Sequence, residues 1–387
     1  MFDMKSMTIR QEFEILRGEP IAVNEIAPVD VPCIEMVDAK RLCRNPVVSV
    51  HMMAYNHAKY IARAIEGVVM QETDFEYELV IGEDCSKDDT RKICFEYQNR
   101  YPDKIRVLWH HENVHNRGGN GARIHAHCRG EFVAFCEGDD YWTDPKKLQK
   151  QIDVMRRHPS VGLCFAGAKI YREAQDSWQT WNDDDVWEPG FIPKEQFLKW
   201  HMFGKNPKKG PIGSEIFIMT ASTLVRRSVL MEAKSKYEIF KWKLRLGDTT
   251  NWLGVSSLAD VYYLPDQVAV YSQYNDGAMG RDWSRVAWDA RLVRLYFFSQ
   301  IYGHDYSEAP ERFLLILVQV AFSRVFKDWS HGAIIAYIAR IFVCRKLWAI
   351  FFSRYTAFPT LVTAVCFIRP LRYRLAARIT NFSLKFI

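Results

Sequence analysis

Apolar and polar positions form regular blocks from Pro46 onward, and the blocks predict strands followed by helices. The first apolar block is VVSVHMMAYN, a β-branched run that ends in a turn. The segment after it, HAKYIARAIEGVVMQ, has apolar residues at helical spacing, namely Ile61, Ile65, Val68 and Val69. This part of the chain therefore predicts a strand and then a helix.

The alternation continues to about residue 275. Further strands are predicted in YELVIGED, IRVLWHH, EFVAFCEGDDYW, VGLCFAGAKIY, IFIMTASTLV and VYYLPDQVAVYS, with helical segments between most of them. Such alternation is typical of an α/β fold, and it predicts a mostly parallel sheet flanked by helices, with a ligand crevice at the carboxyl ends of the strands. Beyond Asp289 the pattern is helical throughout.

These changes of pattern divide the chain into three segments. Residues 1–45 form a polar amino-terminal extension broken by prolines, residues 46–275 the α/β domain, and residues 276–387 a helical carboxyl-terminal region. The nine cysteines are an odd number with no CxxC pair, and the amino terminus lacks the basic start and apolar run of a signal peptide. We therefore expect a reducing, cytoplasmic location without a disulfide framework.

The net charge of +6 conceals an asymmetry. From Arg312 to the end the chain has twelve basic side chains and one acid, Asp328, so the basic character belongs to the tail. None of its apolar runs approaches the roughly 18 uninterrupted apolar residues that a membrane-spanning helix needs.

The last residues of the chain predict an amphipathic helix. Apolar side chains share one face: Leu371, Leu375, Ile379, Phe382 and Phe386. Basic side chains share another: Arg374, Arg378 and Lys385. Such a helix favours an anionic membrane surface, although a helical bundle packed on the α/β domain is an alternative. A nucleic acid would also attract this charge, but no recognition motif accompanies it, so we expect no nucleic-acid partner.

Three carboxylates follow one apolar strand in the segment CEGDDYW. Glu137, Asp139 and Asp140 repel one another, and an arrangement of this kind is usually retained because a cation neutralises it. Oxygen ligands select Mg²⁺ or Mn²⁺. The alternative is an acidic turn that caps the helix beginning at Asp144 and Pro145.

Other candidate residues are weaker when taken singly. Glu83 and Asp84 end the strand LVIGED and should face the same crevice, although this turn can also cap the following helix. The loop NRGGNGAR matches no standard phosphate-binding motif, but Arg117 and Arg123 are reasonable partners for an anionic ligand. Asp248, in LRLGDTTNWL, is by itself an ordinary helix cap.

Taken together, three ordered blocks resemble family 2 of the glycosyltransferases, which have the GT-A fold. The blocks are VVSVHMMAYNHAKYIARAIEGVVMQ, LVIGEDCSKDDT and GEFVAFCEGDDYWTDPKKLQKQ, and the resemblance spans roughly residues 46–275. It implies a Rossmann-like catalytic domain and an inverting transfer from a nucleotide sugar, most often a UDP-sugar, to a hydroxyl of a glycan or lipid-linked glycan acceptor. A cytoplasmic enzyme on the inner face of the plasma membrane, acting in cell-surface polysaccharide synthesis, would fit this family.

The resemblance also implies roles for individual residues. Tyr55 and Asp84 would contact the nucleotide base, while Asp139 and Asp140 match the DxD-type motif that touches the ribose and the metal, Mn²⁺ or Mg²⁺. Asp248 falls where the family has its catalytic base. Independently of the resemblance, the loop NRGGNGAR makes Arg117 a candidate contact to the anionic donor.

Two positions depart from the family pattern. Glu137 replaces the first Asp of DxD, and the chain reads Tyr271, Ser272, Gln273, Tyr274 where relatives often read YRxH. Trp181 and Trp187 are candidates for an acceptor wall, because sugars stack on indoles, or for ordinary packing. The alternatives to an active transferase are a catalytically silent relative that binds a glycan or partner, and another metal-dependent nucleotide-sugar enzyme.

Overall fold

The computed structural model describes residues 10, 14, 32–114, 119–181, 188–203, 218–242, 244, 247–274 and 283–302. The chain divides into two units. One comprises Val23–Leu198 with Phe217–Asp289, and the other comprises Met1–Ala22, Lys199–Ile216 and Ala290–Ile387. The first unit contains the sheet and all the candidate residues that the structure describes.

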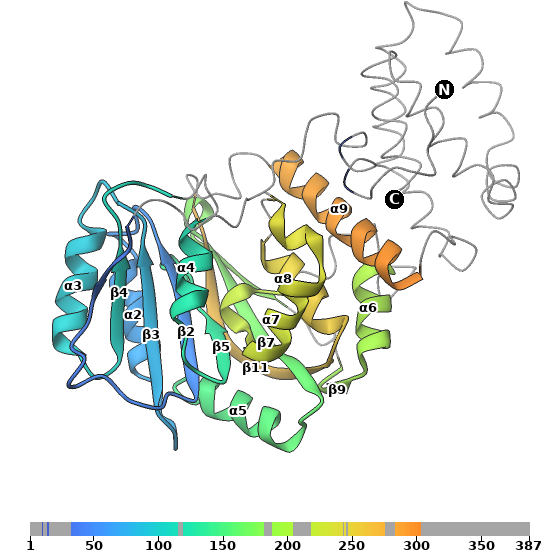
Figure 1. Cartoon of the computed structure of the whole chain (residues 1–387), viewed down its shortest axis with the longest axis horizontal. Coiled ribbons are helices and arrows are strands. Elements are labelled where there is room, and N and C mark those ends of the chain that lie inside the picture. Colours follow the sequence, from blue (N-terminus) through green and yellow to red (C-terminus); the bar gives the residue numbers. More distant parts are fainter. Residues whose placement is uncertain are drawn as a thin grey trace, which may run out of the picture. The chain divides into compact units, whose positions relative to one another are not determined.

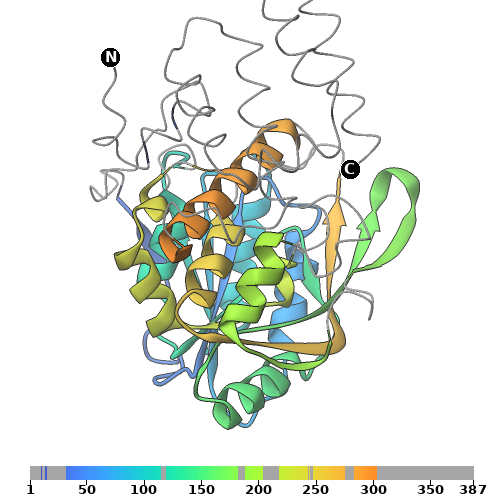
Figure 2. The same cartoon turned by 90° about the vertical axis from the view of Figure 1, so that its right-hand side faces the viewer.

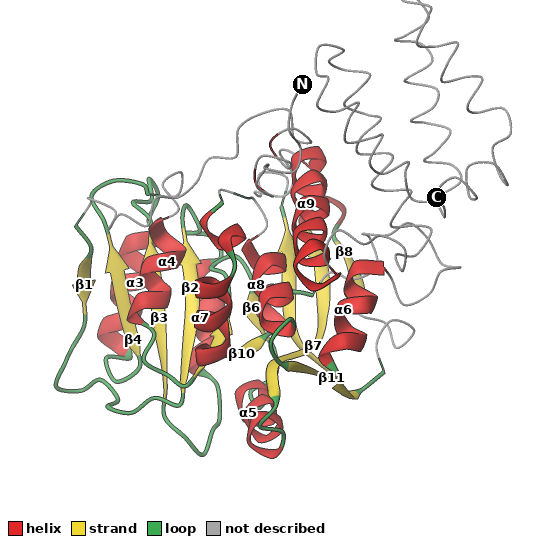
Figure 3. Cartoon of the chain, turned by 45° about the vertical axis from the view of Figure 1, so that its right-hand side comes forward, coloured by secondary structure: helices red, strands yellow, loops and turns green. Residues whose placement is uncertain are grey.

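The described residues form one mixed sheet of eleven strands, in the order β1-β4-β3-β2-β5-β10-β7-β11-β6, with β8 added to β7 and β9 added to β11. Figure 3 shows the strands in yellow, with β1 at one edge. The strands are β1 Ile34–Met36, β2 Val48–Ala54, β3 Tyr77–Glu83, β4 Ile105–Trp109, β5 Phe132–Phe135, β6 Tyr141–Trp142, β7 Val161–Arg172, β8 Ser177–Trp181, β9 Gly190–Ile192, β10 Leu224–Arg226 and β11 Asp260–Gln273.

The half of the sheet formed by β4, β3, β2 and β5 is parallel, as the alternating pattern predicts. β7 and β11 are also parallel, whereas β1, β6, β8, β9 and β10 pair in antiparallel fashion. The carboxyl ends of β2, β3 and β5 therefore meet at one edge. The antiparallel hairpin of β7 and β8 is the green ribbon that projects in Figure 2.

Helices flank the sheet, and α4, α7 and α8 lie in front of it in Figure 1. α4 packs against β2 and β3, α7 packs against α8, and α2 packs against α3 and β6. The helices are α2 Ile61–Val69, α3 Thr90–Arg100, α4 Gly119–His127, α5 Lys147–Arg157, α6 Lys194–Phe203, α7 Arg227–Lys236, α8 Gly247–Ser256 and α9 Trp283–Tyr302, with three short 3₁₀ turns, η2 Glu173–Gln175, η3 Thr220–Ser222 and η4 Glu238–Lys241.

Burial of the apolar stripes explains why these segments form these elements. On α2, Ile61, Ala64, Ile65 and Val68 are fully buried at positions one turn apart, which is the helical spacing read from the sequence. β3 is buried at every position because both faces of the parallel region are covered. Each large apolar side chain buried in this way contributes about 1.5–3 kcal/mol, and truncation of Ile65 to alanine would cost about 2–5 kcal/mol.

Two strand expectations are wrong in part. The segment EFVAFCEGDDYW forms two separate strands, β5 and β6, with a loop between them. The segment IFIMTASTLV contains the 3₁₀ turn η3 and only the start of β10, while residues 216 and 217 lie outside the described ranges. The hydroxyl groups explain the turn, because Ser222 donates to the Met219 carbonyl at 2.8 Å and Thr223 donates to the Thr220 carbonyl at 2.6 Å. Such local bonds compete with the ladder of a sheet.

The predicted helical character of the carboxyl-terminal region is present in α9, which runs from Trp283 to Tyr302. Residues 303–387, with the basic tail, lie outside the described ranges, as does most of the segment before residue 32. Among the helices that the structure describes, none is long and apolar enough to cross a membrane.

Candidate active site

The turns after β2 and β3 are bonded to each other at the carboxyl edge of the sheet. Asn56 has a positive φ of 55°, which asparagine tolerates better than most residues. Its backbone N–H donates to the Ser86 hydroxyl at 3.0 Å, and its side-chain oxygen accepts the Lys87 N–H at 2.8 Å. Tyr55, next to it, is 38% exposed and so keeps an aromatic surface open to a ligand.

The two acids at the end of β3 have different surroundings. Glu83 is fully buried, accepts the Ser86 N–H at 2.6 Å and forms an ion pair with Arg91. Asp84 is 2% exposed and accepts the Val114 N–H at 2.7 Å. Glu83 therefore holds the turn and the start of α3, whereas Asp84 lies at the edge and orders the loop that follows β4.

The acid loop, residues 137–140, lies directly beside the end of β2. The Gly138 N–H donates to the Met53 carbonyl at 2.9 Å, and the Met53 N–H donates to the Glu137 carboxylate at 3.3 Å. A Cβ on Gly138 would lie 2.7 Å from His57 Nδ1 and 3.0 Å from the Met53 oxygen, so the loop can approach this closely only with glycine there.

The two aspartates of the acid loop point to different partners. One Asp139 carboxylate oxygen lies 3.9 Å from His57 Nε2, and the Asp139 carbonyl accepts the Tyr274 hydroxyl at 2.7 Å. Asp140 is 4% exposed and accepts the backbone N–H of Ser272 at 3.0 Å. Asp140 is thus anchored to β11, while the side chain of Asp139 remains partly exposed.

Asp248 lies in the first turn of α8, and both of its carboxylate oxygens have a donor. The Thr249 N–H donates to one oxygen at 2.6 Å, and the Thr220 hydroxyl donates to the other at 3.2 Å. The bond from Thr249 is local to the first turn of α8. The bond from Thr220 comes from a separate segment of the chain.

The pKa values indicate that these acids share one site. Burial, with Asp139 and Asp248 nearby, raises the pKa of Glu137 to about 8, although the Met53 N–H opposes the shift. Burial and the adjacent Asp139 raise the pKa of Asp140 well above its usual range. Burial also raises the pKa of Asp248, against the opposing effect of its hydrogen bonds.

The same carboxylates affect the pKa of Tyr271, which lies on β11. Burial raises its pKa, and Asp140, Asp139 and Asp248 raise it further. The fold therefore brings Asp248 into the electrostatic surroundings of the acid loop, which precedes it by more than 100 residues. Repulsion of this kind marks a place where a cation or a proton stabilises the site.

The acid loop offers few protein ligands to a metal ion. Within the described ranges, no three His, Cys, Asp or Glu side chains are grouped closely enough to hold one. Mg²⁺ is, however, commonly bound by one or two carboxylates together with the phosphates of a substrate. Asp139 and Asp140 fit that kind of site, in which the metal and the diphosphate bind together.

Several residues that sequence reasoning singled out are placed elsewhere or not described. Arg117 and Trp187 lie outside the described residues, and Trp181 is the last residue of β8. Arg123 lies on α4, where its guanidinium is 2.7 Å from Nδ1 of His110.

Three residues of the site were missed from the sequence: His57, Thr220 and Tyr274 in its role beside Asp139. Tyr274 stacks on Tyr60 with ring centroids 3.9 Å apart, which places the end of β11 against the start of α2. Pairs so distant along the chain carry no local signal.

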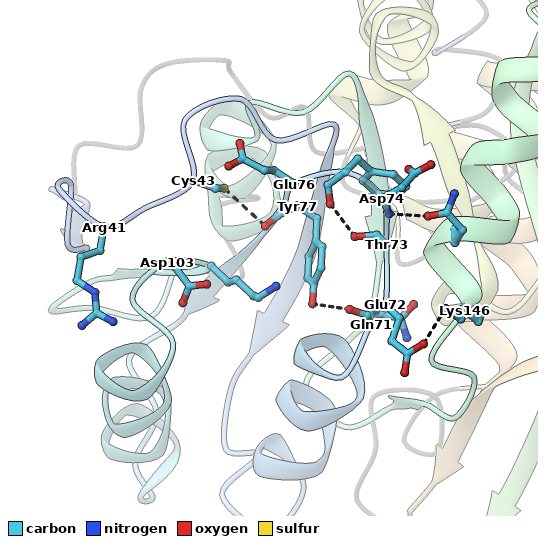
Figure 4. Close-up of a pocket in the computed structure, with 13 residues that line it drawn as sticks. Arg41, Cys43, Gln71, Glu72, Thr73, Asp74, Glu76, Tyr77, Asp103 and Lys146 are labelled. Atoms are coloured by element: carbon cyan, nitrogen blue, oxygen red, sulfur yellow. Dashed lines mark hydrogen bonds and ion pairs between the residues drawn. The ribbon is translucent and has the colours of Figure 1, made fainter.

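A cavity of about 720 Å³ lies at the opposite edge of the sheet, beside the start of β3 (Figure 4). Three of its charged side chains are in ion pairs: Lys146 pairs with Glu72 at 2.7 Å, and Asp74 pairs with Arg156 at 3.2 Å. Tyr77 donates to backbone carbonyls at the end of α2. We therefore place the site at the acid loop and not in this cavity.

Known proteins resemble the chain in this same region. Residues 49–233 match the family model described as Glycosyl transferase family 2. The chain is 39% identical to an uncharacterized protein of Mycobacterium tuberculosis over 132 residues. The aligned stretch covers 34% of this chain and 38% of that protein. Over 133 residues it is 35% identical to TuaG of Bacillus subtilis, whose name describes a teichuronic acid biosynthesis glycosyltransferase, covering 34% of this chain and 49% of TuaG.

A solved structure of TarS from S. aureus, in complex with UDP-GlcNAc, aligns over 72% of this chain and 83% of that one, with 16% identity and a TM-score of 0.48. The chain spans about two fifths of the length of the mycobacterial relative and about half that of TuaG. Residues 49–233, a little under half of the chain, thus resemble glycosyl transferase family 2.

Proposed function

We propose that the protein is an inverting glycosyltransferase that moves a sugar from a nucleotide sugar, a UDP-sugar in the first instance, to a hydroxyl of a glycan or lipid-linked glycan. The observation that carries the proposal is the gathering of Glu137, Asp139, Asp140 and Asp248 at the edge where the strands end, with raised pKa values for Glu137, Asp140 and Asp248. The match of residues 49–233 to the family model supports the same interpretation.

The nucleotide binds between the turns after β2 and β3 in this proposal. Tyr55 offers an exposed ring to the base, and Asp84 contacts the base from the end of β3. Arg117 lies outside the described residues and stays a candidate partner for the diphosphate. Asp139 contacts the ribose and the metal, and Asp140 contacts the metal.

Mn²⁺ or Mg²⁺, when bound at Asp139 and Asp140, would offset the charge that grows on the departing nucleoside diphosphate. Asp248 accepts the proton of the acceptor hydroxyl as that oxygen bonds to the anomeric carbon. The bond from the anomeric carbon to the phosphate oxygen breaks in the same step, and its electron pair leaves with the diphosphate. The raised pKa of Asp248 makes it a better proton acceptor than an ordinary aspartate.

The proposed biological setting draws support from the relatives and from the composition of the tail. The name of TuaG refers to teichuronic acid biosynthesis, and we propose that this chain acts in the synthesis of a cell-surface polysaccharide. The basic, amphipathic tail would hold the protein on the cytoplasmic face of the plasma membrane.

A thermal-shift screen tests the donor site. The full-length protein is melted with UDP, GDP, UDP-glucose, UDP-GlcNAc and GDP-mannose, each with and without Mn²⁺, and Asp140→Asn serves as the matched variant. We expect Mn²⁺-dependent stabilisation by one nucleotide family, and loss of it in the variant. No response to any nucleotide would instead favour a catalytically silent protein that binds a glycan or a partner.

A further inference from the structure

The turn of residues 219–223, which contains η3 and precedes β10, is held by buried side chains from another segment. The indole N–H of Trp142 donates to the Ala221 carbonyl at 2.8 Å. The side-chain amide of Gln151 donates to the next carbonyl, that of Ser222, at 2.9 Å. These donors lie in β6 and α5, the segment that directly follows the acid loop.

A third donor completes the contact. The amine of Lys147 lies 3.4 Å from the Thr223 carbonyl and donates to Gln151 Oε1 at 2.8 Å. Lys147 is fully buried and lies over the ring of Trp142, 4.1 Å from its centroid. Because a buried amine without acceptors is costly, these bonds must persist in the native state, and three successive carbonyls are fixed together.

The other side of the turn faces Asp248. The Thr220 hydroxyl donates to Asp248 Oδ2 at 3.2 Å, while the Thr249 N–H holds Oδ1. The hydrogen bond from the Thr249 N–H comes from the adjacent residue of the same helix, so it moves with that helix. Among the bonds that described residues make to this carboxylate, the one from Thr220 ties it to the rest of the fold.

We propose that Thr220 is the positioning residue for Asp248, and that the turn carrying it is fixed by Trp142, Lys147 and Gln151. Trp142 follows Asp140 by two residues, so one short segment fixes both the acid loop and, through the turn, the carboxylate of Asp248. The buried side chains that fix the turn thereby set the position of the proton acceptor relative to the donor sugar. This inference rests on the proposed role of Asp248 as the base.

The test compares Thr220→Val, which keeps the shape and removes the hydroxyl, with Thr220→Ser, which keeps the hydroxyl. Thr73→Val is the matched control, because the Thr73 hydroxyl bonds the Phe75 carbonyl at 2.6 Å at the opposite edge of the sheet. The full-length proteins are assayed with Mn²⁺ for release of nucleoside diphosphate from the nucleotide sugar that stabilises the wild type. Donor affinity and thermal stability are measured in parallel.

We expect kcat to fall about tenfold or more in Thr220→Val, because a displaced base loses its alignment with the acceptor. Donor affinity should stay within about twofold of wild type, since Thr220 acts on the chemical step and not on donor binding. Thr220→Ser should recover most of kcat, and Thr73→Val should behave as wild type. If Thr220→Val does not fold, Thr220→Ala removes the same hydroxyl and is judged by the same criteria.

A wild-type kcat in the hydroxyl-free variant would overturn the inference, as would an equal loss in the serine variant. Asp248→Asn separates this failure from that of the proposed function. If Asp248→Asn is inactive and Thr220→Val has normal turnover, Asp248 is still the base and only the positioning role of Thr220 is contradicted. Normal turnover in Asp248→Asn would contradict the proposed role of Asp248 as the base.

Discussion

Asp140 accepts a hydrogen bond from the backbone N–H of Ser272 at 3.0 Å, although 132 residues separate the two along the chain. The bond lies next to the pairing of β6 with β11, in which Tyr141 is opposite Val270. One carboxylate oxygen of Asp140 is thus held by the sheet. An anchored carboxylate can present its other oxygen to a metal without first losing side-chain freedom.

Asp140→Asn should abolish this metal contact while it preserves the fold. The amide oxygen can still accept the Ser272 N–H, but it carries no charge to attract Mn²⁺. We expect the Mn²⁺-dependent affinity for the nucleotide donor to fall at least about tenfold, since even indirect perturbation of metal ligands costs about that much. Isothermal titration calorimetry with and without Mn²⁺ measures the change. Asp103→Asn is the control, because Asp103 is exposed at the opposite edge of the sheet. Unchanged metal-dependent binding in Asp140→Asn would show that Asp140 is not a metal ligand.

Gly138→Ala should displace the acid loop. The new methyl group would lie 2.8 Å from Ile61 Cδ1 and 3.0 Å from the backbone oxygen of Met53, which cannot move without β2. We expect a loss of about 1–3 kcal/mol in the free energy of unfolding, and a larger proportional loss of donor affinity. Gly247→Ala is the control for both measurements, because a Cβ there meets no atom of the described residues within 4 Å. Full donor affinity in Gly138→Ala would show that the close approach to Met53 is not required.

The parallel half of the sheet could be predicted because its signals are local. The apolar runs of β2, β3 and β5 and the turns that end them lie within short stretches of sequence. The position of Asp84 and Asp139 at the same edge of the sheet follows from that topology alone. The proximity of Asp248 to the acid loop does not, and it was expected only from the family resemblance.

Thr220 could not be identified in the same way. Its segment, TASTLV, is rich in β-branched residues, and this pattern predicts a strand. The hydroxyl bonds within the turn outweigh that preference, and the donors that fix it come from Trp142, Lys147 and Gln151, far away in the sequence. Contacts of this kind depend on tertiary structure, which periodicity does not encode.

The carboxyl-terminal tail should bind anionic membranes through its charge. Replacing Arg374, Arg378 and Lys385 together with glutamine keeps the apolar face of the predicted helix. At about 1 kcal/mol for each basic residue near the surface, binding to vesicles that contain phosphatidylserine should weaken by roughly 100-fold. Cosedimentation of the full-length variant and wild type measures the change. Equal binding by both would favour a tail that packs as a helical bundle.

Glu78→Gln should destabilise the fold without touching the site. Glu78 is fully buried, and its carboxylate accepts bonds from Arg129 at 2.6 Å, Arg106 at 3.2 Å and Ser49 at 2.6 Å. Removing its charge leaves the two guanidinium groups without their shared partner. We expect a loss of about 3 kcal/mol in the free energy of unfolding, measured by urea denaturation at pH 7. Glu96→Gln, on the exposed face of α3, should change it by less than about 0.5 kcal/mol.

The same contacts predict how this stability depends on pH. Burial alone would raise the pKa of Glu78, but the bonds from Arg129 and Ser49 outweigh it and lower the pKa. A lowered folded-state pKa means that the stabilisation is complete above the unfolded value of about 4.3 and is lost as the pH falls through the folded value. Wild type should therefore lose its advantage over Glu78→Gln below about pH 4. An advantage that persists undiminished to pH 3 would show that the charge of Glu78 is not its source.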